Sequence, residues 1–221
     1  MKILDQFDTV NDFDYENGFY LTSSLDRLGK LLAHYELYKK ITSLPGAIVE
    51  CGVFKGASLL RFATFRNLLE SPFSRKIIGF DVFDEFPATH FEKDKEYLEK
   101  FIASAGANSI SFEELQSVFK YKQINNYELV KGDINITIPQ YKKINPHLKI
   151  ALLHIDTDVY EPCVTILNHL FENVVRGGII AFDDYGTFPG ETQAVDEFIN
   201  DKEIIVNKLS ISHIPSYLIK Q

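Results

Sequence analysis

The sequence predicts an α/β fold whose mostly parallel sheet carries helices on both faces. Two observations point to it: short apolar segments alternate with longer amphipathic ones, and polar residues, chiefly aspartates, directly follow the apolar segments. Alternating strands and helices are typical of parallel sheets, whose strands are buried on both faces. Such sheets bind ligands beyond the carboxyl ends of their strands, so these polar residues mark a candidate site.

In the first half of the chain, residues 23–44 are expected to form a helix that Pro45 and Gly46 end. Its apolar side is expected to hold Leu25, Leu28, Leu32, Tyr35 and Tyr38. A buried strand and its turn are expected at 47–53, further strands at 76–80 and 127–130, and helices at 56–69, 92–103 and 111–121.

In the second half, a strand is expected at 149–155, a helix at 163–171 and a strand at 179–182, with Gly177 and Gly178 as the helix stop signal. A last helix is expected at 193–199. The β-rich segments 204–209 and 211–219 suggest an antiparallel terminal pair, and Pro215 favours an edge position for the second.

Composition narrows the class of protein. Hydrophobic residues make up 45% of the 221 residues, and acidic residues outnumber basic ones, 31 to 23, which argues against a nucleic-acid partner. The acidic N-terminus does not resemble a signal peptide and no apolar run approaches the roughly 20 residues that span a bilayer, so we expect a soluble, cytoplasmic protein without a membrane partner. Cys51 and Cys163 are expected to be reduced core thiols.

A glycine turn runs from Glu50 to Ser58 and includes Gly52 and Gly56. Glycines between a strand and a helix let a ligand approach the backbone, and the helix N-terminus offers free N–H groups to an anion. The spacing is neither GxGxxG nor a Walker loop, and a purely structural role for these glycines stays open. The Glu50 carboxylate, at the end of an apolar strand, needs a partner.

Asp81 closes the next expected strand. An acidic residue there can accept hydrogen bonds from both hydroxyls of a ribose, or it can cap the following turn. Together with Gly52 it suggests a nucleoside-bearing cofactor.

Four carboxylates form an acidic set at the ends of two later strands: Asp156, Asp158, Asp183 and Asp184. Bunched carboxylates resist ionisation unless a cation neutralises them, and oxygen ligands favour Mg²⁺. The alternative is a set of loop caps. His154 points to the same face as Asp156 and contacts either a ligand or the core.

The following loop, 184–190, is rich in glycine and proline. It either lines the substrate side or is an ordinary connection.

Taken together, these residues resemble the macrocin O-methyltransferase family, the TylF-type sugar methyltransferases. The resemblance covers about residues 45 to 200, in the same order. The matching stretches are 46–53 with Gly56 and Ser58, 79–87, 131–133, 153–161, 177–186, 189–190 and 193–196.

The resemblance implies a class I methyltransferase (Rossmann-like) fold with a seven-stranded sheet and an antiparallel C-terminal strand pair. It also implies S-adenosylmethionine as methyl donor, Mg²⁺, and a sugar-containing small molecule as acceptor. Residues 45–221 would form the cofactor-binding domain and residues 1–44 a helical cap. The implied cofactor residues are Glu50, Gly52, Val53, Gly56 and Ser58 around the methionine part, Asp81 at the ribose, Gly132 and Asp133 at the adenine, and Asp156. The implied metal ligands are Asp156, Asp183 and Asp184.

The sequence departs from the family pattern at Thr157, where glycine is usual, and at Pro162 and Cys163, where Ser-Thr is usual. These changes bear on the acceptor more than on the reaction. A carboxylate is expected to take the proton from the acceptor hydroxyl, with Asp158 as first candidate and Asp156 as second. The lysine base of catechol-type enzymes is absent, because Val159 stands in its place.

Other functions stay open. An NAD-dependent oxidoreductase would also use Asp81, and a Mg²⁺-dependent catechol or phenol methyltransferase shares nearly all of these features. A non-catalytic scaffold would bind the cofactor without transfer. The fold often pairs, so a homo-oligomer is open as well.

Overall fold

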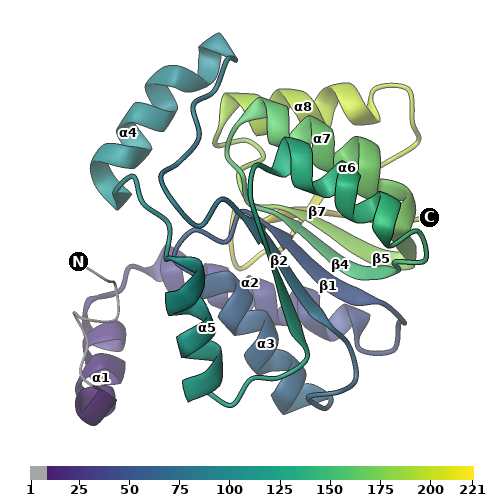
Figure 1. The fold of residues 1–221 in the computed structure, drawn as a ribbon. Coiled ribbons are helices and arrows are strands. Elements are labelled where there is room, and N and C mark those ends of the chain that lie inside the picture. The colour runs from purple at the N-terminus through teal and green to yellow at the C-terminus, as the bar shows by residue number, and fades with distance from the viewer. Residues whose placement is uncertain (1–8) are drawn as a thin grey trace.

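The computed structural model describes residues 9–221. Its centre is a seven-stranded sheet with the strand order β3-β2-β1-β4-β5-β7-β6 (Figure 1). Neighbours among β1 to β5 run parallel, while β7 is antiparallel to β5 and β6, which confirms the expected class I methyltransferase topology. The strands are β1 Ala47–Cys51, β2 Ile77–Asp81, β3 Tyr127–Lys131, β4 Ile150–Ile155, β5 Val174–Phe182, β6 Asn207–Lys208 and β7 Ser216–Ile219.

Helices cover both faces of the sheet, as Figure 1 shows. One core layer lies between the sheet and α2, α3 and α5, and the other between the sheet and α6, α7 and α8. The α-helices are α1 Asp12–Thr22, α2 Leu25–Ile41, α3 Ala57–Leu69, α4 Lys95–Ala105, α5 Phe112–Tyr121, α6 Ile134–Ile144, α7 Tyr160–Leu170 and α8 Pro189–Ile199. Short 3₁₀ helices occupy Thr9–Asn11, Glu92–Asp94 and Phe171–Asn173.

The apolar side expected for α2 is partly wrong. Leu25 is 85% exposed and Leu32 is 48% exposed. The buried residues of α2 are Gly29, Ala33, His34, Leu37, Tyr38 and Ile41. Their spacing of three and four residues is helical, but the stripe is rotated from the leucines because α2 packs its small and aromatic residues against the sheet and α3.

One helix has no counterpart among the expected elements, and one expected stop signal is wrong. Helix α6 is the additional helix, and its residues 134–139 include isoleucines, a threonine and Pro139, which have low helix propensity. Asp133 caps α6 by accepting a hydrogen bond from the Asn135 N–H at 2.8 Å. Gly177 and Gly178 do not stop a helix, since α7 ends at Leu170 and both glycines lie inside β5.

Strand β7 is not an edge strand, because it pairs with β5 on one side and β6 on the other. Pro215 directly precedes it and therefore costs the sheet no hydrogen bond. The edge beyond β7 is the two-residue strand β6, shorter than the segment 204–209 expected there.

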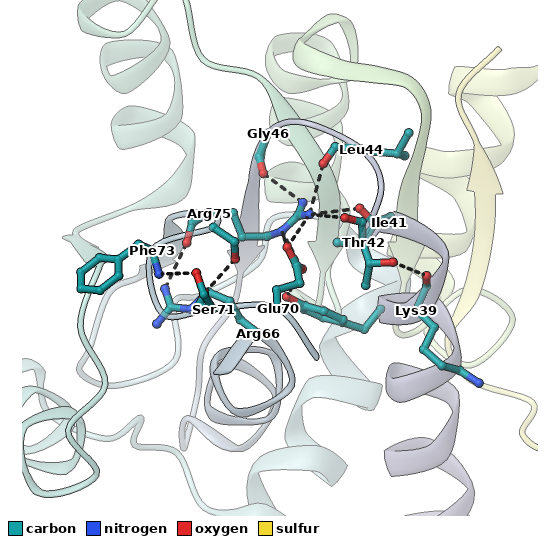
Figure 2. A network of polar contacts seen from close by, with 12 residues as sticks. Lys39, Ile41, Thr42, Leu44, Gly46, Arg66, Glu70, Ser71, Phe73 and Arg75 are labelled. Atoms are coloured by element: carbon teal, nitrogen blue, oxygen red, sulfur yellow. Dashed lines mark hydrogen bonds and ion pairs between the residues drawn. The ribbon is translucent and has the colours of Figure 1, made fainter. Parts of the chain in front are cut away.

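A buried arginine closes the C-terminal end of α2 (Figure 2). The Arg75 guanidinium donates to the carbonyl oxygens of Ile41, Leu44 and Gly46, each at 3.1 Å. Its charge is balanced by Glu70 at 2.9 Å. This network satisfies the free carbonyl groups at the end of the helix and fixes the approach of the chain to β1.

The two helices within residues 9–44 differ in burial. Within the described part, α2 belongs to the core, whereas α1 has no buried residue and lies away from the sheet in Figure 1. The expected boundary between a cap at 1–44 and a domain at 45–221 stays a prediction, and its first eight residues lie outside the described part.

Cys51 and Cys163 are buried and free, as expected for core thiols. Among the helices of residues 9–221, none combines the length and the apolar character needed to cross a bilayer.

Candidate functional site

A cavity of about 480 Å³ lies at the carboxyl ends of the parallel strands. The turn after β1 and the ends of β2, β4 and β5 form its floor, and residues of α2, α3, α4 and the segment 86–90 form its walls. Of the residues expected at a site, it is lined by Gly52, Val53, Ser58, Asp81, Asp133, Asp156, Asp158, Asp183 and Asp184. Glu50, Gly56 and Gly132 do not line it, and neither does His154.

Asp81 organises the glycine turn. Its Oδ2 accepts hydrogen bonds from the backbone N–H groups of Val53 at 2.8 Å and Phe54 at 2.9 Å, and its Oδ1 accepts from Phe83 N–H at 2.6 Å. The carboxylate thereby ties the end of β2 to the turn after β1. It also lines the cavity, so contact with a ribose remains open to it and stays a prediction.

Gly52 is required by the protein's own backbone. Its φ is +89°, a left-handed conformation that favours glycine, and an added Cβ would overlap the carbonyl oxygen of Asp156. The strand β1 and the segment after β4 can therefore approach closely only with glycine at this position. Gly56 also has a positive φ, at the start of α3.

Glu50 lies behind the turn in a buried network. The Ser58 hydroxyl donates to its Oε1, and His154 Nδ1 lies 3.5 Å from the same oxygen. His154 is therefore a core histidine with polar partners on both sides, because its Nε2 lies 3.3 Å from Asp183 Oδ1. Although burial opposes the charge, Asp183 and Glu50 raise the pKa of His154 to about 10. A charged His154 supplies the partner that the Glu50 carboxylate needs.

Three carboxylates converge at the ends of β4 and β5. Oxygens of Asp156, Asp158 and Asp184 lie within 4.8 Å of one another. Burial, together with the nearby carboxylates, raises the pKa of Asp158 to about 8 and raises the pKa values of Asp156 and Asp184. Asp158 also has a φ of +61°, a strained conformation for a residue other than glycine.

Asp183 is oriented differently from its neighbour Asp184. Lys30 of α2 donates to its Oδ2, while His154 and, at 3.8 Å, His34 face its Oδ1. Although burial opposes ionisation, the Lys30 and His154 charges hold the pKa of Asp183 well below its usual range. The three residues expected as metal ligands therefore do not all lie together. Asp156 and Asp184 cluster with Asp158, whereas Asp183 lies beside His34, His154 and Lys30.

The carboxylate cluster fits a hard divalent cation. Within the described residues, Asp184 Oδ2 is buried without a hydrogen-bond partner. All the atoms that the cluster offers as ligands are carboxylate oxygens. A cation would neutralise the repulsion that raises these pKa values, and oxygen donors suit Mg²⁺. The Asp156, Asp158 and Asp184 carboxylates could therefore hold it, with Asp183 alongside.

Glu191 supports this cluster and was not expected from the sequence. Its Oε1 accepts from the Asp184 N–H at 2.8 Å, and it is fully buried. Burial, reinforced by Asp184, raises the pKa of Glu191. Its position on the first turn of α8 fixes the backbone of Asp184 relative to the cavity.

Two more carboxylates hold the wall segment before α4. Asp94 accepts from the N–H groups of Tyr160 at 2.9 Å and Gly190 at 2.7 Å. Glu161 accepts from the N–H groups of His90 at 2.8 Å and Phe91 at 2.9 Å. This segment is thus bound to the first turns of α7 and α8, and it stays near the acidic cluster.

The comparison that identifies the family covers most of the chain. The sequence profile of the macrocin O-methyltransferase (TylF) family matches residues 25–218. The chain belongs to this family.

Relatives of this TylF family member include a demethyldecarbamoylnovobiocin O-methyltransferase from Streptomyces niveus. It is 28% identical over 164 residues, which make up 71% of this chain and 59% of the relative. The chain thus spans about three fifths of that relative's length.

Two solved structures are also similar. The calicheamicin methyltransferase CalS11 is 27% identical with a TM-score of 0.76, over 98% of this chain and 88% of that one. Its apo form is described as a TDP-rhamnose 3'-O-methyltransferase. The O-methyltransferase NovP has a TM-score of 0.74 at 20% identity, over 87% of this chain and 80% of that one, and supports the fold.

The departures from the TylF pattern fall in different places. Thr157 is buried, and its hydroxyl has no hydrogen-bond partner within the described residues. Pro162 lines the cavity, whereas Cys163 is packed in the core. Thr157 lines the cavity as well, so the changes at Thr157 and Pro162 alter the cavity wall directly, whereas the change at Cys163 does not.

Sequence reasoning missed the basic residues of the site. Arg27 and Lys30 of α2 and Arg61 of α3 line the cavity. Charged residues on a helix are usually solvated, so the residue type alone did not indicate that these residues belong to the site. Their spacing could have indicated it, because Arg27, Lys30 and His34 recur at three and four residues on the side of α2 that also holds buried residues.

Proposed function

We propose that this TylF family member is an S-adenosylmethionine-dependent O-methyltransferase that acts, with Mg²⁺, on a hydroxyl of a sugar-containing small molecule. The observation that carries the proposal is the buried carboxylate cluster beside the glycine turn, in one cavity, in a chain of this family. The turn suits the cofactor and the cluster suits a cation and an acceptor hydroxyl.

The cofactor would lie across the ends of β1, β2 and β3, and it supplies a methyl group already activated on a sulfonium. Gly52, Val53 and Ser58 would border its methionine part, with Gly56 shaping the turn and Glu50 holding Ser58 from behind. Asp81 would face the ribose. Asp133 would lie beside the adenine, with Gly132 fixing its backbone. The protein's main task is then to align the acceptor oxygen with the methyl group.

The metal would be held by Asp156, Asp184 and either Asp158 or Asp183, and it supplies Lewis acidity that lowers the pKa of an acceptor hydroxyl. Glu191 and Lys30 orient Asp184 and Asp183, respectively, from behind. In this arrangement the metal would add positive charge to Asp156 and Asp184, whose pKa values stay raised although Lys30 opposes the shift.

Asp158 is the proposed general base in the arrangement in which Asp183 completes the metal site, with Asp156 second. Its carboxylate lines the cavity, and its oxygens lie within 4.8 Å of those of Asp156 and Asp184. A general base must lie within reach of the proton that it takes, and this position beside the proposed metal ligands supports the assignment. Asp158 would accept the hydroxyl proton as the new C–O bond forms.

The first test removes the metal and one carboxylate. EDTA, or Asp184→Asn, should lower methyl transfer to an acceptor at least about 100-fold, because each loses charge stabilisation at the acceptor oxygen. Asp183→Asn should act in the same direction. Calorimetric binding of S-adenosylhomocysteine should survive in all three cases. Asp196→Asn, a carboxylate outside the cavity, is the control and should keep full activity.

Full activity in EDTA would contradict the metal role and leave the methyl transfer standing. Binding of NADH instead of S-adenosylhomocysteine would contradict the methyltransferase proposal itself. An acceptor panel of nucleotide sugars, glycosides and catechols then separates sugar from phenol methylation.

A further inference from the structure

The cavity wall formed by α2 and α3 carries two arginines that make no ion pair within the described residues. Arg27 and Arg61 both line the cavity, from α2 and α3. Among residues 9–221, neither guanidinium has a hydrogen bond or an ion pair. The protein as a whole is acidic, with 31 acidic and 23 basic residues, so this pair of arginines has the opposite sign to the net charge of the protein.

The positive charges of the Arg27 and Arg61 guanidinium groups repel each other. Arg61 is partly buried, and burial, together with the charge of Arg27, lowers its pKa even though Asp183 opposes the shift. Two like charges in a partly enclosed cavity repel, and desolvation adds to the cost. An anion bound between them would remove that cost. The planar guanidinium matches phosphate oxygens in a bidentate manner, which lysine does not.

The arginines lie on the acceptor half of the cavity. Arg27 stands one helical turn before Lys30, which binds Asp183. The carboxylates that act on Arg61 are Asp183 first, then Glu50 and Asp156. Asp183 and Asp156 lie at the ends of β5 and β4, and Glu50 lies on β1 between the two halves of the cavity. The residues proposed for the ribose and adenine, Asp81 and Asp133, lie on the other side of β1, at the ends of β2 and β3.

We propose that Arg27 and Arg61 form a phosphate site for the acceptor, so that the methylated sugar carries a phosphate or nucleoside diphosphate group. This inference rests on the proposed function and narrows its substrate class. An uncharged glycoside would leave both arginines unpaired in the complex, whereas a sugar phosphate or a nucleotide-linked sugar would pair them.

The test measures binding rather than turnover. Uridine diphosphate, thymidine diphosphate, glucose 1-phosphate, glucuronic acid and methyl glucoside are titrated calorimetrically into protein saturated with S-adenosylhomocysteine. The variants are Arg27→Gln, Arg61→Gln and, as matched control, Arg176→Gln, an exposed arginine of β5 outside the cavity. Arg27 is exposed, so its variant should fold even if that of Arg61 does not.

We expect a phosphate compound to bind the wild-type protein and each cavity variant to weaken it by about tenfold or more, as expected for lost hydrogen bonds to a charged group. Affinity for S-adenosylhomocysteine should stay within about twofold, and Arg176→Gln should change neither. A diphosphate that binds better than glucose 1-phosphate indicates a nucleotide-linked sugar, and the reverse indicates a simple sugar phosphate.

The proposal is overturned if no phosphate compound binds, if glucuronic acid alone binds, or if both variants weaken S-adenosylhomocysteine as much as phosphate. The last result would assign the arginines to the cofactor's carboxylate. Failure of the proposed function is distinct, because there the wild-type protein would not bind S-adenosylhomocysteine at all.

Discussion

At the scale of single residues, Gly52 shows how the site depends on backbone contact. Gly52→Ala should lower the free energy of unfolding by about 2 kcal/mol or more and abolish S-adenosylhomocysteine binding, because the new Cβ would overlap the Asp156 carbonyl at a positive φ. Urea unfolding and calorimetry measure both effects. Gly18→Ala is the control: its Cβ meets no atom within 4 Å, and alanine favours the helix. Unchanged binding of S-adenosylhomocysteine by Gly52→Ala would contradict the proposed dependence of the site on this close backbone contact.

His34 is the residue from which an acid effect is expected. Burial against Phe62 and the sheet lowers its pKa from 6.5 to about 4. The folded protein therefore binds fewer protons than the unfolded chain between these values, so stability is full above pH 6.5 and falls as the pH drops toward 4.

In His34→Leu, the loss of unfolding free energy between pH 6.5 and 4.5 should be smaller than in the wild type by about 2 kcal/mol. Urea titrations at both pH values measure the difference. His213→Leu, a change at an exposed histidine, serves as control and should keep the wild-type loss. Equal losses in His34→Leu and the wild type would show that His34 does not titrate as proposed.

At the scale of elements, the network at the end of α2 fixes the helix that carries Arg27 and Lys30. Arg75→Met should lower the free energy of unfolding by about 3 kcal/mol or more, because Glu70 and several carbonyl groups lose a buried partner. The neighbouring Lys76→Met removes an exposed ion pair with Glu128 and should cost less than about 1 kcal/mol. Urea unfolding compares the two, and equal costs would contradict the proposed role of Arg75.

Some helices and strands were predictable from the sequence, and others were not. The strands β1 to β4 were predictable because each is a short, mostly apolar segment followed by a turn or polar residue, although β3 contains Glu128 and is only partly buried. Helix α6 was not, since its isoleucines and Pro139 argue against a helix and tertiary packing decides otherwise. The face of α2 was misjudged because its exposed leucines outweighed Gly29 and Ala33, which allow close packing.

The residues of the site were likewise only partly predictable from the sequence. Aspartates at strand ends were predictable because parallel strands bring their carboxyl ends to one edge of the sheet. The partners of these aspartates were not, because Lys30, Glu191 and the arginines come from helices whose orientation depends on packing. The division of the acidic set, with Asp183 turned toward Lys30 and His154, likewise depends on side-chain placement.

At the scale of the whole molecule, the cavity joins two halves across β1. The ends of β2 and β3 offer Asp81 and Asp133, and the ends of β4 and β5 offer the carboxylate cluster. The helix α2 and the segment before α4, which Asp94 and Glu161 bind, both contribute to the cavity wall. This division suits the proposed methyl donor on one side and the proposed metal-bound acceptor on the other.

A crystal structure with S-adenosylhomocysteine and Mn²⁺ in place of Mg²⁺ tests most directly whether the cavity holds a cofactor and a metal side by side. We expect the cofactor product across Gly52 to Ser58 with its adenosine toward Asp81 and Asp133, and an anomalous peak between Asp156 and Asp184. A cofactor product bound elsewhere, or no anomalous peak among these carboxylates at saturating Mn²⁺, would contradict it.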